Sequence, residues 1–68
     1  MFQLMINGEN QTFSSPIKTI KELLDKLNIA EKGRIIELNN KIIKKENFST
    51  VTLKNQDSIE IIQFMGGG

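Results

Sequence analysis

The residues of this chain that could take part in chemistry are Gly66, Gly67 and Gly68, the last three of its 68 residues. Glycine loses more backbone entropy on folding than any other residue, so this run predicts a mobile tail. A tail without side chains can enter a narrow channel and place its ionised terminal carboxylate beside ATP. An activated glycine acyl group also cannot racemise. The other interpretation is a frayed terminus or a cloning scar, and composition alone leaves both open.

The remaining composition offers little catalytic chemistry. The chain has no Cys and no His, which excludes disulfides, thiol nucleophiles, Cys/His zinc sites and imidazole acid–base catalysis. No two carboxylates have a spacing suited to acid–base work, so we assign no catalytic residue and no metal ligand. A chain this short has a small core and little room for a deep substrate pocket. We therefore expect a protein that is not an enzyme.

The charge balance argues against two classes of partner. Nine Lys/Arg against eight Asp/Glu leave a net charge of +1, which favours neither nucleic acid nor an anionic membrane. No segment approaches the run of about 20 apolar residues that spans a bilayer, and the first residues lack the basic flank of a signal peptide. We expect a cytoplasmic protein. The cluster of Lys41, Lys44 and Lys45 is interpreted as a solvated loop.

The elements that must carry the tail begin with a hairpin and a helix. Alternation of Phe2, Leu4 and Ile6 with polar residues predicts a strand, and Asn7-Gly8 predicts a tight turn into a second strand. Thr19-x-x-Glu22 is a capping box, in which each side chain can bond the other residue's amide. One helical face follows, formed by Ile20, Leu23, Leu24 and Leu27.

The second half of the chain predicts more strands. Residues 34–38 and 42–43 flank a turn at Asn39-Asn40, and residues 58–64 form the last strand, with Ile59 and Ile61 on one face. The loop residues Phe48, Val51 and Leu53 are expected to fill a gap in the core. This order predicts an α+β fold in which one main helix packs on one face of a mixed four- to five-stranded sheet. The first and last strands would lie parallel at its centre.

A group of apolar residues lies beside the tail. Ile62, Phe64 and Met65 fall on or next to the strand face that should not pack on the helix, and Met5 and Ile35 can join them. Contiguous exposed apolar residues often mark partner-binding sites. We therefore predict that Ile62, Phe64 and Met65 bind a partner.

Several motifs together resemble the ThiS sulfur carriers of thiamin biosynthesis. They are the Asn-Gly hairpin, Thr19-x-x-Glu22-Leu23-Leu24, the segment 38–43, Asp57-x-Ile59-x-Ile61 and the terminal Gly-Gly. The resemblance runs the length of the chain. It implies a ubiquitin-like β-grasp domain over residues 1–65 and a flexible tail over residues 66–68.

The resemblance also implies a reaction cycle. A ThiF-like, E1-type adenylating enzyme would activate the carboxylate of Gly68 with ATP, so the carrier itself would bind no cofactor. A sulfur-donating enzyme would then convert the adenylate into a thiocarboxylate, and the thiazole synthase ThiG would receive the sulfur. Gly68 is the implied modified residue and Gly67 its required neighbour, whereas the family accepts other small residues at Gly66.

Two segments depart from the family pattern, and other functions stay open. Lys44-Lys45 replaces a frequent Pro-Arg, and Asn55-Gln56-Asp57 replaces a frequent Asp-Gly-Asp, where Asn55 is expected to take the left-handed conformation. The alternatives are a MoaD-like carrier for molybdopterin, a carrier for another sulfur metabolite, and a non-covalent β-grasp interaction module.

Overall fold

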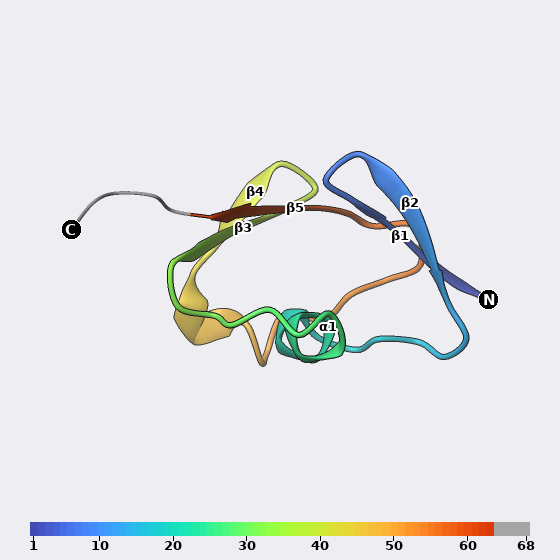
Figure 1. The fold of residues 1–68 in the computed structure, drawn as a ribbon, viewed down its shortest axis with the longest axis horizontal. Helices are drawn as coiled ribbons and strands as arrows, with labels where there is room; N and C mark the ends of the chain where they lie inside the picture. Colours follow the sequence, from blue (N-terminus) through green and yellow to red (C-terminus); the bar gives the residue numbers. More distant parts are fainter. Residues whose placement is uncertain (64–68) are drawn as a thin grey trace.

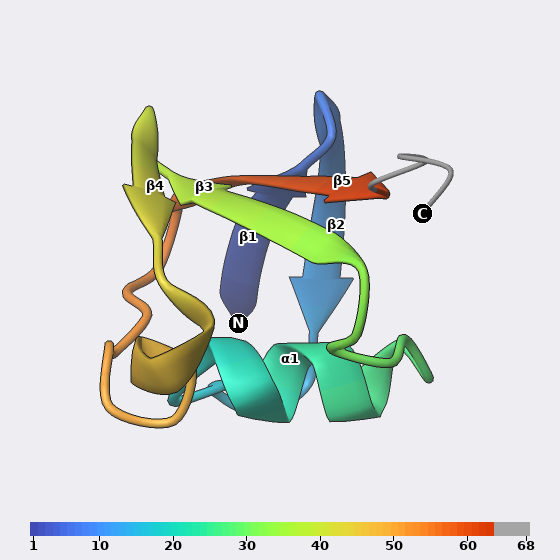
Figure 2. The ribbon, with the colours of Figure 1, turned by 90° about the vertical axis from the view of Figure 1, so that its left-hand side faces the viewer.

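A curved mixed sheet of five strands wraps around one short helix in the computed structural model, which describes residues 1–63 (Figures 1 and 2). The strands are β1 (Phe2–Ile6), β2 (Glu9–Phe13), β3 (Arg34–Leu38), β4 (Lys41–Ile43) and β5 (Ser58–Gln63). Their order across the sheet is β2-β1-β5-β3-β4. β1 and β5 pair in parallel, and the other neighbours are antiparallel. The predicted arrangement of one helix on a mixed sheet, with the end strands parallel at its centre, is confirmed.

Two tight turns set the register of the two hairpins, β1–β2 and β3–β4. Asn7 and Gly8 join β1 to β2 with φ values of 51° and 82°. Asn39 and Asn40 join β3 to β4 with φ values of 50° and 71°. Positive φ at both central residues matches the right-handed twist of the flanking strands, and Asn and Gly adopt it at the lowest cost. Both predicted turns are confirmed.

The helix α1 (Ile20–Lys26) has a cap at each end. At its start the Thr19 hydroxyl accepts a hydrogen bond from the Glu22 amide at 3.1 Å. The Glu22 carboxylate accepts from the Lys18 amide at 3.1 Å rather than from Thr19, so the reciprocal half of the predicted capping box is wrong by one residue. At its end Asn28 has a φ of 59°, and the Asn28 and Ile29 amides donate to carbonyls of the last turn.

The core lies between the helix and the concave face of the sheet (Figure 2). Among the residues predicted to face it, Ile20, Leu23, Leu24, Leu4, Ile6, Ile36 and Ile59 are buried, and Leu27 and Ile61 pack partly buried against them. Phe2 and Ile17 complete the buried set together with loop residues Phe48 and Leu53. The loop that follows β4 thus fills the open side of the curved sheet, as the apolar residues at 48, 51 and 53 predict.

The connection from the 3₁₀ helix Lys45–Asn47 to β5 contains one unexpected conformation. The left-handed residue of the turn before β5 is Gln56, with a φ of 72°, so the expectation that Asn55 would take this conformation is wrong. Asn55 instead uses its side-chain oxygen to accept from the Gln3 amide at 2.7 Å, and the Gln56 amide donates to the Gln3 carbonyl at 2.6 Å. These two bonds to β1 hold Gln56 in a conformation that costs a non-glycine residue free energy. None of the helices in residues 1–63 is long and apolar enough to cross a membrane.

Candidate functional site

The strand that leads to the predicted tail has a neighbouring strand on each side. β5 lies between β1 and β3, so both of its edges are paired. Its pairing with β3 runs from Leu38–Ile59 to Arg34–Gln63, the last described residue. The pairing with β3 therefore holds β5 as far as Gln63. The predicted reactive glycines Gly66, Gly67 and Gly68, together with Phe64 and Met65, lie outside the described residues.

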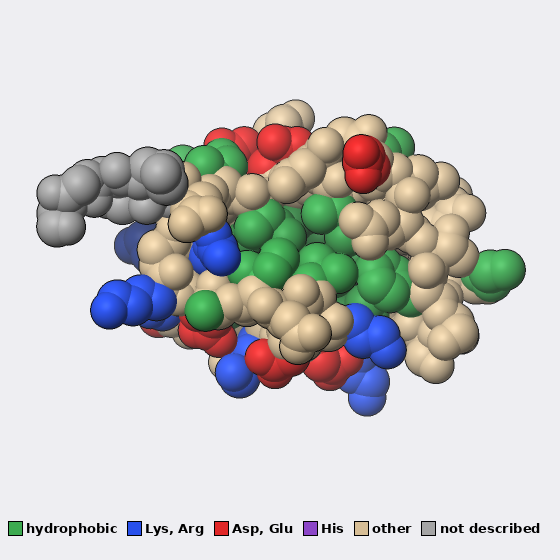
Figure 3. Space-filling view, viewed as in Figure 1, with side chains coloured by type: hydrophobic (Ala, Val, Ile, Leu, Met, Phe, Trp, Pro, Cys, Tyr) green, Lys and Arg blue, Asp and Glu red, His purple; other side chains and the backbone are tan. Residues whose placement is uncertain are grey.

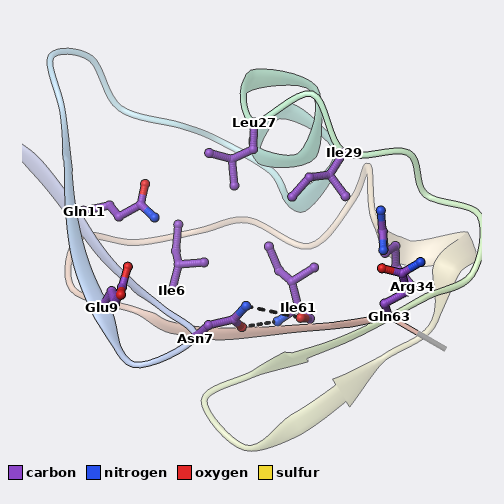
Figure 4. A pocket seen from close by; sticks show the side chains of 9 residues that line it. All are labelled: Ile6, Asn7, Glu9, Gln11, Leu27, Ile29, Arg34, Ile61 and Gln63. Carbon is purple, nitrogen blue, oxygen red and sulfur yellow. Dashed lines mark hydrogen bonds between the residues drawn. The ribbon is translucent and has the colours of Figure 1, made fainter. Parts of the chain in front are cut away.

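The side chain of Asn7 extends the pairing of β5 beyond the end of β1. The parallel ladder itself contains Met5–Ser58 and Ile6–Ile59. Past it, the Ile61 amide donates to Asn7 Oδ1 at 2.7 Å, and Asn7 Nδ2 donates to the Ile61 carbonyl at 3.3 Å (Figure 4). The side-chain amide thus occupies the place of a backbone partner. Asn7 thus bonds β5 at Ile61, two residues before the last described residue, Gln63.

Sequence reasoning identified Asn7 only as a turn residue. Its bonds to Ile61 span 54 positions of the chain, so no local pattern reveals them. The available signal was its position directly after a strand that should lie beside the last strand. An Asn or Asp there can both take the left-handed conformation and offer a side-chain amide or carboxylate to the neighbouring strand.

The convex side of the sheet, facing away from the helix, is called the outer face. Strand alternation places these residues on it: Gln3, Met5, Asn10, Thr12, Ile35, Glu37, Ile42, Ser58, Glu60 and Ile62. Met5 and Ile62 are each 40% exposed, and Ile42 is 69% exposed. Ile62 pairs with the half-buried Ile35. Ile62 therefore lies where alternation predicts it, with Met5 and Ile35 on the same face, and its role in partner binding stays a prediction.

A hollow opens on the other side of β5, between the sheet and the end of the helix (Figures 3 and 4). Its volume is about 410 Å³. Ile6, Leu27, Ile29 and Ile61 give it an apolar floor, and its polar lining consists of Asn7, Glu9, Gln11, Arg34 and Gln63. The sequence alone does not predict this hollow. Its walls come from five separate segments, which only the fold brings together.

The hollow lacks the groups that a catalytic site requires. Its ionisable side chains are Glu9 and Arg34, and Arg34 Nε donates to the Ala30 carbonyl at 3.3 Å. Neither residue adjoins a hydroxyl or thiol nucleophile in the lining of the hollow. Within residues 1–63, no three His, Cys, Asp or Glu side chains gather closely enough to hold a metal ion. The described residues therefore form exposed surfaces and the strand that leads to the tail, but no arrangement of catalytic groups.

Known proteins are similar in sequence to nearly the whole length of this chain. A sequence model of the ThiS family matches residues 4–68. The sulfur carrier protein ThiS of Bacillus subtilis is 38% identical over 65 residues, which cover 96% of this chain and 98% of that protein. A thiazole synthase of Paramagnetospirillum magneticum is 35% identical over 66 residues, and there the match spans 97% of this chain but only 20% of the longer protein.

A solved structure shares the fold. The crystal structure of a thiamine biosynthesis protein (ThiS) from Geobacter metallireducens superimposes with a TM-score of 0.87 at 33% sequence identity. The superposition covers 98% of this chain and all of that one (100%). The mixed sheet with one helix is therefore the β-grasp fold that the sequence predicts.

Proposed function

This chain belongs to the ThiS family of sulfur carrier proteins, and we propose that it carries sulfur as a thiocarboxylate on Gly68 for thiazole formation in thiamin biosynthesis. The observation that supports this proposal most directly is the family match, which runs through the glycine tail to residue 68. The described residues add that the body of the protein offers no catalytic constellation, so the chemistry would belong to the tail and to its partner enzymes.

The proposed cycle begins with adenylation. The Gly68 carboxylate attacks the α-phosphorus of ATP in the active site of a ThiF-like, E1-type enzyme and releases pyrophosphate. Hydrosulfide supplied by a sulfur-donating enzyme then attacks the acyl carbon, where a C–S bond forms and the bond to AMP breaks, so that AMP leaves and the thiocarboxylate remains. Three glycines span at most about 10 Å in extended form, which lets the terminus enter an active site while the folded domain stays outside.

The proposed receiver of the sulfur is a thiazole synthase, ThiG. The relative from Paramagnetospirillum magneticum supports this, because a protein named as a thiazole synthase contains a segment similar to nearly all of this chain. When two partners occur in one polypeptide, their effective concentration toward each other rises sharply. We infer that this chain delivers its sulfur to the same kind of enzyme.

The outer face is the proposed docking site for the adenylating enzyme. Ile62 lies there next to the end of β5, and Met5 and Ile35 share the face. Phe64 and Met65, outside the described residues, continue this apolar sequence toward the tail. A partner that covers these side chains would hold the terminus at its own active site.

The test uses the full chain, a ThiF-like enzyme from the same organism, and ATP. ATP–pyrophosphate exchange reports adenylation, and intact mass after addition of a sulfur donor reports replacement of one oxygen by sulfur at the terminus. We expect both signals with the native chain and neither after deletion of Gly68. If ATP–pyrophosphate exchange occurs but no sulfur donor yields a thiocarboxylate, the protein is adenylated but is not a sulfur carrier.

A further inference from the structure

The charges of this small protein are unevenly distributed over its surface. Of the described residues on the outer face, two are acidic, Glu37 and Glu60, and none is Lys or Arg. The whole chain nevertheless has nine basic residues and a net charge of +1. In Figure 3 acidic and hydrophobic side chains lie along the upper margin, and Lys and Arg lie to the left and below, with further acidic side chains among them. The outer face thus has two negative charges and no positive charge among its described residues, whereas acidic and basic side chains are mixed on the lower part of the surface in view.

The two acidic residues of the outer face are opposite each other in the sheet. Glu37 on β3 and Glu60 on β5 are a registered cross-strand pair, so both side chains leave the sheet on the same face. Like charges in this relationship destabilise a sheet. The ion pairs found within residues 1–63 both involve Lys21 on the helix, and neither includes Glu37 or Glu60. The repulsion between the two carboxylates is therefore not relieved inside the described part of the domain.

Apolar side chains surround this acidic pair. Ile35 and Ile62 form the next outward pair along β3 and β5, and Ile42 on β4 is the registered neighbour of Glu37. A side chain that approached the pair from a partner would be screened from water by these isoleucines. Charge–charge attraction strengthens as water is excluded.

We propose that the outer face binds a cationic patch of the adenylating enzyme, with an Arg or Lys side chain of that enzyme placed between Glu37 and Glu60. This inference rests on the proposed function and adds the chemistry of the partner surface to it. The incoming cation relieves the repulsion of the two carboxylates, while the surrounding isoleucines contact apolar side chains of the partner. A guanidinium suits the position best, because it can bond two carboxylates at once.

Charge reversal of Glu60 separates binding from folding. In the isolated protein, Glu60→Lys replaces a repulsive cross-strand pair by an attractive one, so the midpoint of thermal unfolding should rise by about 2–5 °C. Against a cationic partner the same change introduces repulsion, and the KM for the carrier in ATP–pyrophosphate exchange should rise about tenfold or more, with kcat little changed. A rise in stability together with a loss of affinity cannot come from misfolding.

The matched control is Glu46→Lys, which makes the same change in net charge. Glu46 is exposed in the 3₁₀ helix, away from the outer face. Its KM should stay within about twofold of the native value. The native KM should also rise when the salt concentration increases from about 50 to 300 mM, because salt screens the attraction.

Three outcomes would overturn the proposal, each for a different reason. If native exchange is normal but Glu60→Lys and Glu46→Lys behave alike, the carrier function stands and the cationic docking surface does not. If the native protein sediments as a dimer that Glu60→Lys dissociates, the occupant of the face is a second copy. If the native chain supports no exchange at all, the proposed function fails and this inference fails with it.

Discussion

Asn7 and Ile61 lie 54 positions apart in the chain, yet the side-chain amide of Asn7 bonds both backbone groups of Ile61, at 2.7 and 3.3 Å. Asn7 therefore has two separate tasks, because it also takes the left-handed conformation of the first turn. The turn positions the residue, and its side chain then holds the strand that leads to the tail.

Asn7→Gly separates these two tasks. Glycine keeps the left-handed conformation but removes both side-chain bonds, so we expect a loss of about 1–2 kcal/mol in the free energy of unfolding. Amide exchange at Ile61 should accelerate more than at the other residues of β5. Asn40→Gly is the control, since Asn40 has a φ of 71° in a similar turn and makes no side-chain hydrogen bond within the described chain. A loss of equal size in both variants would mean that the bonds to Ile61 contribute nothing.

The turn before β5 contains a conformation that suits glycine better than the residue present. Gln56 has a φ of 72°, so Gln56→Gly should raise the free energy of unfolding by about 0.5–1 kcal/mol in spite of the greater freedom of glycine in the unfolded chain. Asn55→Gly should instead destabilise the protein, because it removes the side-chain acceptor of the Gln3 amide. Denaturant unfolding of the two variants measures both effects, and gains at both positions would contradict this account of the turn.

Two isoleucines of β5 test whether the outer face serves binding rather than folding. Ile62→Ala should weaken binding to the adenylating enzyme by more than about 1 kcal/mol if Ile62 anchors the interface, with little change in stability. Ile59→Ala removes a fully buried side chain from the same strand and should cost about 2–5 kcal/mol of stability. Calorimetric titration and thermal unfolding give both quantities. Unchanged affinity for Ile62→Ala would remove that residue from the interface.

Phe64→Ala extends the same test toward the tail. We expect weaker binding to the adenylating enzyme, because an aromatic side chain is a frequent anchor of protein interfaces. Its measurement is the same titration as for Ile62. A large fall in the unfolding temperature, without any change in affinity, would assign Phe64 to the core instead.

The tail itself is tested by Gly67→Val. A β-branched side chain next to the terminus should prevent entry into a narrow channel and abolish ATP–pyrophosphate exchange, while the free energy of unfolding stays unchanged. Gly66→Ala is the milder control, since it adds only a methyl group and lies one residue farther from Gly68. Exchange at the native rate with Gly67→Val would show that the channel does not require glycine there.

Most of the fold could be predicted because its signals are local. Asn7-Gly8 and Asn39-Asn40 specify their turns by their own conformational preferences, and the alternation of Phe2, Leu4 and Ile6 specifies which side of β1 is buried. Once the end strands pair in parallel, a single helix can cover the sheet in few ways.

The features that could not be predicted depend on residues far apart in the chain. Gln56 takes the left-handed conformation while its amide and the Asn55 side chain bond Gln3, and no rule of local turn chemistry selects Gln for this position. The opposition of Glu37 and Glu60 likewise requires the exact register between β3 and β5. Such details require the register of the completed sheet, which the local pattern does not contain.

The central position of β5 also has a consequence for folding during synthesis on the ribosome. β1 and β3 both pair with this strand, and it is the last element of the described chain to be synthesised. A nascent chain that stops before Ser58 has two hairpins and a helix, but it lacks the strand that pairs with both hairpins. Native structure therefore forms only after the residues of β5 have been synthesised and can pair with both β1 and β3.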